Sequence, residues 1–177
     1  MECLGNIFKN IITTIIIPVL LALVGAYFIN KYLFFVAIVP TGSMLPTIQL
    51  QEKLFITSVW DTNTLERGDI VVFDSDELGE ILIKRLIGLP GDKVEIKLSE
   101  QGVNETWING EIIEESYVKY QSSFEEQSFT VPEDHFFFLG DNRSASLDAR
   151  FWENPYIHKD DIKGKATYTT RFQRIES

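Results

Sequence analysis

The sequence predicts a mainly β domain that is tethered to a membrane by one N-terminal transmembrane helix. Near the start of the chain lies a long apolar run without charge. The remainder contains many short segments rich in β-branched and aromatic residues, separated by turn residues. No stretch of this body has a convincing helical period, and only the acidic segment Glu111–Glu126 is ambiguous. Many short strands usually fold into sandwiches or barrels, and we expect an antiparallel β-sheet or barrel-like fold.

Composition excludes several classes of function. The 177 residues suffice for one domain with an appendage, and the net charge of −10 comes without a basic stripe. Nucleic acid is therefore not an expected partner, because phosphate binding needs clustered Lys and Arg. The single cysteine, Cys3, can form neither an intrachain disulfide nor a cysteine-based metal site. The two histidines, His135 and His158, lack ligand spacing, so we expect no metal or cofactor and no histidine base.

The first expected element is the membrane helix, Ile11–Ile29, which is uncharged over 19 residues. At ~1.5 Å per residue this length nearly spans a ~30 Å hydrocarbon core. A cleavable signal peptide is the alternative, but its apolar core is shorter and follows a clearly basic start. Lys9 and Lys31 flank the run, so positive charge does not decide the orientation. We expect residues 1–30 to form a tip and anchor, and residues 31–177 to form the β-rich domain.

The strands follow in order along the body. Tyr32–Pro40 is too short for a second span and is expected to be a strand that begins near the membrane surface. Asn-Gly within Thr106–Ile113 predicts a tight hairpin, and Leu-Pro-Gly-Asp at Leu89–Asp92 predicts a turn. The other expected strands lie at Glu52–Trp60, Asp69–Ser75, Glu80–Gly88, Asp92–Leu98, Ser128–Pro132 and His135–Gly140.

A candidate nucleophile lies in the stretch PTGSMLPT, Pro40–Thr47. In an extended chain Thr41 and Ser43 face the same side, and Gly42 between them permits close approach of another backbone. Ser43 could then attack a carbonyl, while its own N–H and the Thr41 hydroxyl stabilise the oxyanion. A strand-ending turn without chemistry is the alternative for this stretch.

A candidate base lies in EILIKRLIG, Glu80–Gly88. Period two places Lys84 between Leu82 and Leu86 on a face that we expect to be buried. Burial lowers the pKa of a lysine, and a neutral lysine is a competent general base in serine–lysine catalysis. The alternative is a strand-edge lysine whose ammonium reaches water.

The third segment, GDNRSASLDAR at Gly140–Arg150, has the composition of a hydrogen-bonded polar cluster. Arg85 lies next to Lys84 and needs a carboxylate if its face is buried. Asp141 and Asp148 are the candidates for this partner.

These segments resemble, in order and rough spacing, the conserved boxes of the type I signal peptidases, or leader peptidases. PTGSMLPTI resembles the nucleophile box, RGDIVVF at Arg67–Phe73 the next strand, KRLIGLPGD the general-base box, and GDNRSASLDAR the final box. The resemblance covers nearly the whole chain, and the single anchor is similar to that of Gram-positive members. Ala149 departs from the serine of many members, at a position without an assigned role.

The resemblance implies a serine endopeptidase that removes signal peptides from exported preproteins. Ser43 would be the nucleophile, Lys84 the general base, and Thr41 an oxyanion donor. Ser146 would orient the Lys84 amine. Asp141 would pair with Arg85, and Asp148 with Arg150. Substrate would add as a strand beside the segments leading into Ser43 and Lys84, in contact with Ile38, Pro40, Met44, Leu82 and Ile83.

The resemblance also decides orientation, because a signal peptide is cut where it emerges from the membrane. The domain would lie outside the cytoplasm on a single-pass anchor, with membrane lipid and preproteins as partners. A pilus-assembly relative that acts on, or chaperones, a few pilins is the alternative. A self-cleaving repressor would need a DNA-binding domain in place of the apolar run.

Overall fold

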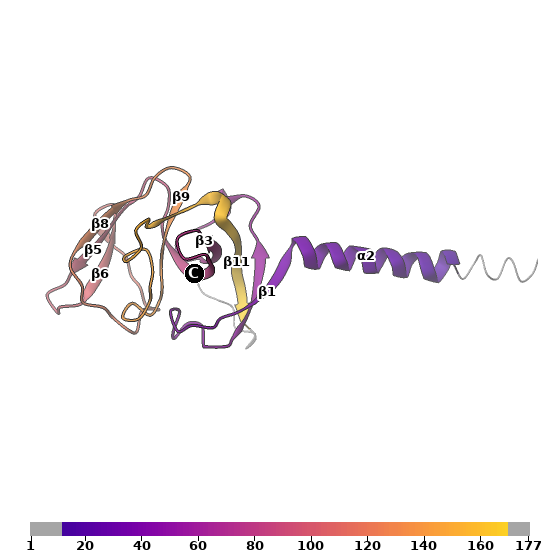
Figure 1. The fold of residues 1–177 in the computed structure, drawn as a ribbon, viewed down its shortest axis with the longest axis horizontal. Helices are drawn as coiled ribbons and strands as arrows, with labels where there is room; N and C mark the ends of the chain where they lie inside the picture. Colours follow the sequence, from indigo (N-terminus) through magenta and orange to yellow (C-terminus); the bar gives the residue numbers. More distant parts are fainter. Residues whose placement is uncertain (1–11, 170–177) are drawn as a thin grey trace, which may run out of the picture. The chain divides into compact units, whose positions relative to one another are not determined.

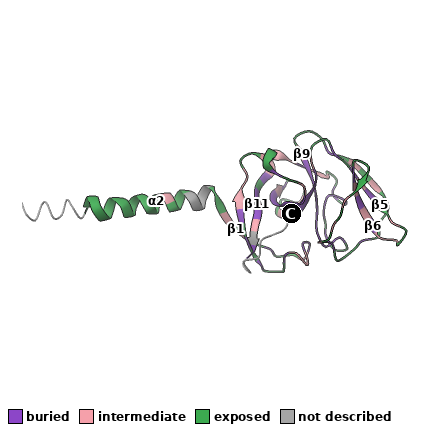
Figure 2. Cartoon of the chain, turned by 180° about the vertical axis from the view of Figure 1, so that it is seen from behind, coloured by how far each residue is buried: buried purple, intermediate pink, exposed green. Residues whose placement is uncertain are grey.

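The computed structural model describes residues 12–169, which divide into two compact units at the boundary between Phe35 and Val36. The first unit contains a π-helical turn η1 (Ile12–Ile16) and helix α2 (Ile17–Tyr32). Pro18 is the second residue of α2 and lacks a backbone N–H, and the π-helical turn η1 lies directly before α2. Figure 2 shows the helix with mostly exposed side chains. No helix within residues 12–169 is long and apolar enough to cross a membrane, so the structure does not show the predicted span, whose first residue lies outside the described part.

The second unit is built from two antiparallel sheets, which are visible as separate groups of strands in Figure 1. The large sheet has the strand order β1-β2-β11-β3-β4-β9-β10, and the small sheet has the order β7-β6-β5-β8. The strands are β1 (Phe34–Ile38), β2 (Lys53–Ser58), β3 (Ile70–Ser75), β4 (Glu80–Gly88), β5 (Lys93–Leu98), β6 (Asn104–Ile108), β7 (Glu111–Ile112), β8 (Gln127–Thr130), β9 (His135–Leu139), β10 (Tyr156–His158) and β11 (Ile162–Thr169).

The mainly β, antiparallel prediction is confirmed, but the barrel-like part of it is wrong. The order of the large sheet runs from β1 at one edge to β10 at the other, and the two edge strands do not pair. The small sheet is likewise open. A sheet closes into a barrel only if its two edge strands pair with each other, and the residue pattern within a strand does not predict that pairing.

Each predicted strand is present, with ends that differ by at most two residues from the predicted ones, and two of the described strands were not predicted. The two are β10 and β11, and β11 pairs with β2 on one side and β3 on the other. The Asn-Gly hairpin between β6 and β7 is confirmed, with positive φ at Asn109 (53°) and Gly110 (90°). The turn before β5 closes with a hydrogen bond from the Asp92 N–H to the Leu89 carbonyl of 3.0 Å. Most of the acidic segment between β7 and β8 is irregular.

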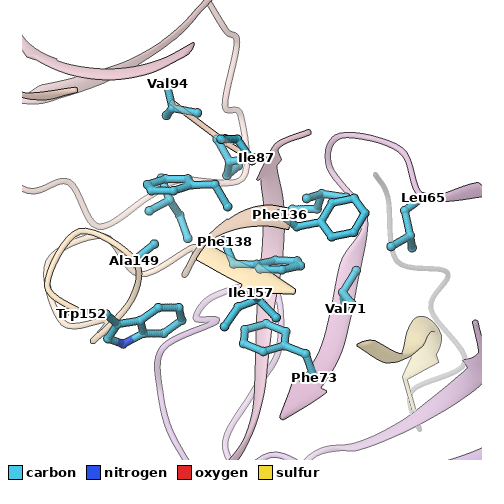
Figure 3. Packing of buried hydrophobic residues seen from close by; sticks show 14 of the residues in the cluster. Leu65, Val71, Phe73, Ile87, Val94, Phe136, Phe138, Ala149, Trp152 and Ile157 are labelled. Atoms are coloured by element: carbon cyan, nitrogen blue, oxygen red, sulfur yellow. The ribbon is translucent and has the colours of Figure 1, made fainter. Parts of the chain in front are cut away.

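The core fills the space over the large sheet and continues to the small one. Figure 3 shows Phe73, Phe138 and Trp152 packed together, with Phe73 and Phe138 stacked at a centroid distance of 4.4 Å. Gly88 ends β4 where the chain passes to the small sheet. A Cβ there would lie 2.8 Å from methyl groups of Val94 and Val131, so only glycine allows this contact between the layers.

The pairing of β4 positions the candidate base. Lys84 lies opposite Val71 of β3, and Arg85 lies opposite both Ile70 of β3 and Leu139 of β9. Strand β9 thus pairs with β4 only from Arg85 onward. The backbone from Glu80 to Lys84 has one neighbouring strand and leaves its other edge open.

Candidate active site

Ser43 and Lys84 lie 41 positions apart in sequence and meet in the structure. Ser43 belongs to the turn that follows β1, and Lys84 lies in the middle of β4. The Lys84 Nζ donates a hydrogen bond of 2.8 Å to the Ser43 Oγ. The exposed fraction is 8% for Ser43 and 4% for Lys84, so little water competes for this contact.

The surroundings of Lys84 disfavour its charged form. Burial lowers its pKa from 10.5 to about 8, against the attraction of the Asp148 and Asp141 carboxylates and with the repulsion of the Arg150 guanidinium. With this pKa, about a tenth of the amine is neutral at pH 7, and a free lysine has well under 1%. The geometry and the protonation state together make Lys84 able to accept the Ser43 proton.

Two hydrogen-bond donors lie beside the nucleophile. The Thr41 Oγ1 is 3.4 Å from the Ser43 Oγ, and Thr41 is solvent-exposed. The Ser43 backbone N–H donates to no group among residues 12–169. Both donors could therefore turn to a negatively charged oxygen that forms next to the Ser43 Oγ.

The loop after β9 holds the backbone on the other side of Ser43. Asn142 donates from its backbone N–H to the Ser43 carbonyl (2.9 Å) and from its Nδ2 to the Gly42 carbonyl (3.0 Å). Gly140 lies close to the same place, since a Cβ on it would be 2.6 Å from the Ser43 carbonyl oxygen and 2.2 Å from the Ser146 Oγ. Glycine at position 140 is required for the loop to approach the nucleophile this closely.

Two buried ion pairs flank the serine–lysine pair. Arg85 donates to both carboxylate oxygens of Asp141, at 2.8 and 2.7 Å, and both side chains are at most 1% exposed. Arg150 binds Asp148 in the same bidentate way, at 2.8 and 2.9 Å. The remaining guanidinium nitrogens donate to carbonyl or hydroxyl oxygens, among them Gly68 O and Ser122 Oγ. Bidentate hydrogen bonds between charged groups are strong, and loss of either partner would leave an uncompensated charge buried.

Two predicted site residues have surroundings that differ from the prediction. The Ser146 Oγ is buried and has no hydrogen-bond partner within residues 12–169, so the expected bond to the Lys84 amine is absent. Met44 was predicted to contact substrate, but its side chain is 0% exposed and lies in the core. It follows Ser43 directly, and the turn there directs it inward.

A groove with a volume of about 280 Å³ opens beside Ser43 and Lys84. Two chain segments form its walls, the end of β1 with the residues after it and the open-edged half of β4. The predicted contact residues Ile38, Pro40, Leu82 and Ile83 all line it. The full lining is Ala37, Ile38, Val39, Pro40, Thr41, Ser43, Glu80, Ile81, Leu82, Ile83 and Lys84.

Several residues of the site were not predicted from the sequence. Asn142 and Arg143 lie within the Gly140–Arg150 segment but had been given no role there. The hydroxyl of Thr47, which was also not predicted, donates to Asp141. Glu115 and Tyr117 come from the segment without a motif. Glu115 forms an ion pair with Arg143, and the Tyr117 ring lies 3.8 Å from the Arg85 guanidinium. No local pattern could have placed these two beside the site, because their contacts come from chain segments far apart in sequence.

Among residues 12–169, no group of three or more His, Cys, Asp or Glu side chains is arranged to hold a metal ion.

Comparison with known proteins places these features in a family. Residues 9–170 match the family described as signal peptidase, peptidase S26. A signal peptidase I of Leptolyngbya laminosa is 36% identical over 137 residues, which cover 72% of this chain and 64% of that protein. A signal peptidase I P of Bacillus subtilis subsp. natto is 36% identical over 157 residues, with 82% and 81% of the two chains covered. The chain thus matches less than two thirds of the length of the first relative.

A solved structure gives the same result for the fold. The crystal structure of a signal peptidase I from Enterococcus faecalis superimposes with a TM-score of 0.50 at 30% identity, and covers 59% of this chain and 97% of that one. These relatives give no support to the alternative of a pilus-assembly protein.

Proposed function

This chain belongs to the signal peptidase family, peptidase S26, and from that premise we propose that it is a serine endopeptidase that removes signal peptides from exported preproteins. One observation carries the proposal. The Lys84 Nζ lies 2.8 Å from the Ser43 Oγ, in surroundings that bring the pKa of the amine to about 8. A hydroxyl and a partly neutral amine at this distance form a nucleophile–base pair.

The first half of the reaction is acylation of Ser43. As the neutral Lys84 amine takes the hydroxyl proton, the Ser43 Oγ forms a bond to the scissile carbonyl carbon. The carbonyl oxygen becomes an oxyanion, which the Ser43 N–H and the Thr41 hydroxyl stabilise. When this intermediate collapses, the carbon–nitrogen bond breaks and the Lys84 ammonium returns its proton to the leaving amine. The mature protein leaves with a new N-terminus, and the signal peptide remains esterified to Ser43.

The second half is hydrolysis of that ester. Lys84, neutral again, takes a proton from a water molecule, and the hydroxide oxygen bonds to the ester carbon. The same two donors stabilise the second oxyanion. The carbon–Oγ bond then breaks, Ser43 regains its proton from Lys84, and the signal peptide leaves with a free carboxylate. One water is consumed, and the enzyme returns to its starting state.

The two buried ion pairs hold the segments around this chemistry. Asp141 and Asp148 lie in the loop that also contacts the Ser43 backbone, and their arginines tie that loop to β4 and to itself. We assign Ser146 a packing role against Gly140, since its hydroxyl makes no hydrogen bond to residues 12–169.

Substrate binds as an added strand in the groove beside Ser43. The residues before the cleavage point lie between the end of β1 and the open edge of β4, where backbone groups of Glu80–Lys84 have no strand neighbour on one side. Ile38, Pro40, Leu82 and Ile83 contact the alternate side chains of that strand. A groove of about 280 Å³ with these apolar walls favours small side chains next to the cut.

The N-terminal part holds the enzyme at a membrane, and the family is membrane-associated. We assign residues 1–30 to a cytoplasmic tip and a single-pass anchor, and residues 31–177 to an extracytoplasmic catalytic domain. The apolar run Ile11–Ile29 and the exposed apolar side chains of α2 support this assignment, together with contact to membrane lipid. Ser43 lies only eleven positions beyond the end of α2 at Tyr32, which keeps the nucleophile near the place where a signal peptide emerges.

The test is cleavage of a preprotein by the purified full-length chain. Wild-type protein should release a product whose new N-terminus, read by mass spectrometry, follows a residue with a small side chain. The Ser43→Ala variant should leave the preprotein intact, because it lacks only the attacking hydroxyl. Equal cleavage by wild type and variant would rule out Ser43 as the nucleophile, and intact preprotein with both would rule out the function.

A further inference from the structure

The segment between β7 and β8 connects two strands of the small sheet, yet two of its side chains lie close to residues of the site. Glu115 and Tyr117 lie in its irregular part. Neither residue lines the groove, and within residues 12–169 neither side chain hydrogen-bonds to Ser43 or Lys84. Their contacts lead instead to Arg85 and Arg143, which lie next to Lys84 and within the loop after β9.

Tyr117 contacts the arginine that follows the base. The Arg85 guanidinium lies over its ring at 3.8 Å from the centroid and at the same time binds Asp141 through two hydrogen bonds. The Tyr117 hydroxyl donates to a Glu115 oxygen over 2.7 Å. Burial and the Glu115 charge raise the pKa of Tyr117 well above its usual range, so this hydroxyl stays a donor. The ring thus covers one face of a buried arginine that would otherwise meet water.

Glu115 holds the other arginine. Its two carboxylate oxygens accept from Arg143 Nη1 at 2.8 Å and Nη2 at 2.5 Å. Arg143 Nε in turn donates to the Gly140 carbonyl (3.0 Å), and its Nη1 also donates to the Thr106 hydroxyl of β6. Burial alone would raise the pKa of Glu115, but the Arg143 charge and hydrogen bonds bring it below its usual range.

The two sets of contacts end in the same short turn. Asp141 is held by Arg85, Arg143 is held by Glu115, and Asn142 lies between them. Asn142 binds the Gly42 carbonyl, which belongs to the same peptide group as the Ser43 N–H, and also binds the Ser43 carbonyl. The direction of the Ser43 N–H, which stabilises the oxyanion, therefore depends on how firmly this turn is held.

We propose that Glu115 and Tyr117 are positioning residues that fix the turn Gly140–Arg143 and, through Asn142, aim the Ser43 N–H at the oxyanion. The inference rests on the proposed peptidase function. It assigns a role in turnover to a segment that carries none of the four sequence boxes. Because neither side chain lies in the groove, their loss should lower kcat and leave KM unchanged.

The test compares full-length variants in preprotein cleavage. Glu115→Gln keeps the shape of the side chain but removes its charge, and Tyr117→Leu removes the ring over Arg85. We expect each to lower kcat about tenfold, since small misplacement of reacting groups is costly. Tyr117→Phe keeps the ring and should lose only about two- to threefold. Glu114→Gln is a matched control at an exposed position of the same segment and should retain wild-type kcat.

A double-variant cycle separates positioning from general loss of structure. If the two residues act through Asn142, Glu115→Gln should lower kcat less than twofold in an Asn142→Ala background. A full tenfold loss in that background would overturn the proposal, as would an unchanged kcat in Glu115→Gln and Tyr117→Leu, or a change confined to KM. If Glu115→Gln and Tyr117→Leu fail to fold, the nearly isosteric Tyr117→Phe variant tests the proposal instead. A kcat of Tyr117→Phe equal to that of wild type would then refute it. Failure of the wild-type protein to cut would instead refute the peptidase function itself.

Discussion

Replacing Lys84 by methionine should stabilise the protein while it abolishes cleavage. Methionine is unbranched and flexible, so it can occupy the buried space of the lysine stem without a charge. Lys84 is 4% exposed and its pKa lies at about 8 instead of 10.5. The folded state therefore bears the cost of burying an ammonium that the unfolded chain keeps in water.

The pKa difference gives the size of this cost. A fall from 10.5 to about 8 corresponds to about 3 kcal/mol, at ~1.36 kcal/mol per pH unit. Loss of the hydrogen bond to the Ser43 Oγ offsets about 1 kcal/mol. Below pH 8 both folded and unfolded wild type are protonated, so the cost is present in full. Between pH 8 and 10.5 only the unfolded chain holds the proton, so wild-type stability rises with pH and the cost disappears.

Urea denaturation of the full-length protein at two pH values measures this effect. At pH 6.5 the Lys84→Met variant should be about 2 kcal/mol more stable than wild type, and at pH 9.5 the difference should be less than about 1 kcal/mol. Lys93→Met is the matched control, because the Lys93 side chain is 55% exposed and should change stability by no more than about 0.5 kcal/mol. A Lys84→Met variant that gains no stability at pH 6.5, or a gain that does not vary with pH, would refute the reasoning.

Three further outcomes follow from the site. Cleavage by wild type should rise with pH through about 8 as Lys84 loses its proton, whereas Lys84→Arg should be inactive at every pH because guanidinium keeps its proton; an active arginine variant would exclude Lys84 as the base. Thr41→Val should lower kcat by about 10²–10³, and Thr41→Ser should stay close to wild type; equal rates for the two would remove the Thr41 hydroxyl from the mechanism. Gly140→Ala should lower both kcat and the thermal midpoint, because its Cβ would lie 2.6 Å from the Ser43 carbonyl oxygen, and a fully active, stable variant would contradict that contact.

The strands could be predicted where local pattern and pairing agree. Phe73 and Val71 come from a run of β-branched and aromatic residues that predicts a strand, and the structure has strand β3 there. Strand β11 (Ile162–Thr169) was missed because lysines and Gly164 interrupt its apolar pattern. Gly164 is required there by tertiary packing, since a Cβ would lie 2.5 Å from the Thr57 carbonyl of β2. Gly164 permits the close approach of β11 and β2, but it also weakens the apolar pattern from which β11 could have been predicted.

The role of a site residue could be predicted from the sequence where that role follows from the residue's neighbours in the same segment. Period two predicted one buried face for β4, but both Lys84 and Arg85 are buried, because the Tyr117 ring and the Asp141 carboxylate lie against Arg85 on the second face. The residues alone left both Asp141 and Asp148 open as partners of Arg85, the family resemblance implied Asp141, and the structure pairs Arg85 with Asp141. Glu115 could not be predicted, because its carboxylate has a role only once Arg143 is brought to it from another part of the chain.

The position of β11 between β2 and β3 determines when, during synthesis, the large sheet and the site can assemble. The segment with Ser43 follows β1 and precedes β2, on one side of β11, while Lys84 lies in β4 on the other side. Strands β2 and β3 do not pair with each other in the large sheet, so β11 joins the two halves. During synthesis both halves emerge long before residues 162–169, and closing so long a loop is slow. We therefore expect the proposed peptidase activity to arise in a newly made chain only after β11 inserts, so that a partly made copy cannot cut its neighbours.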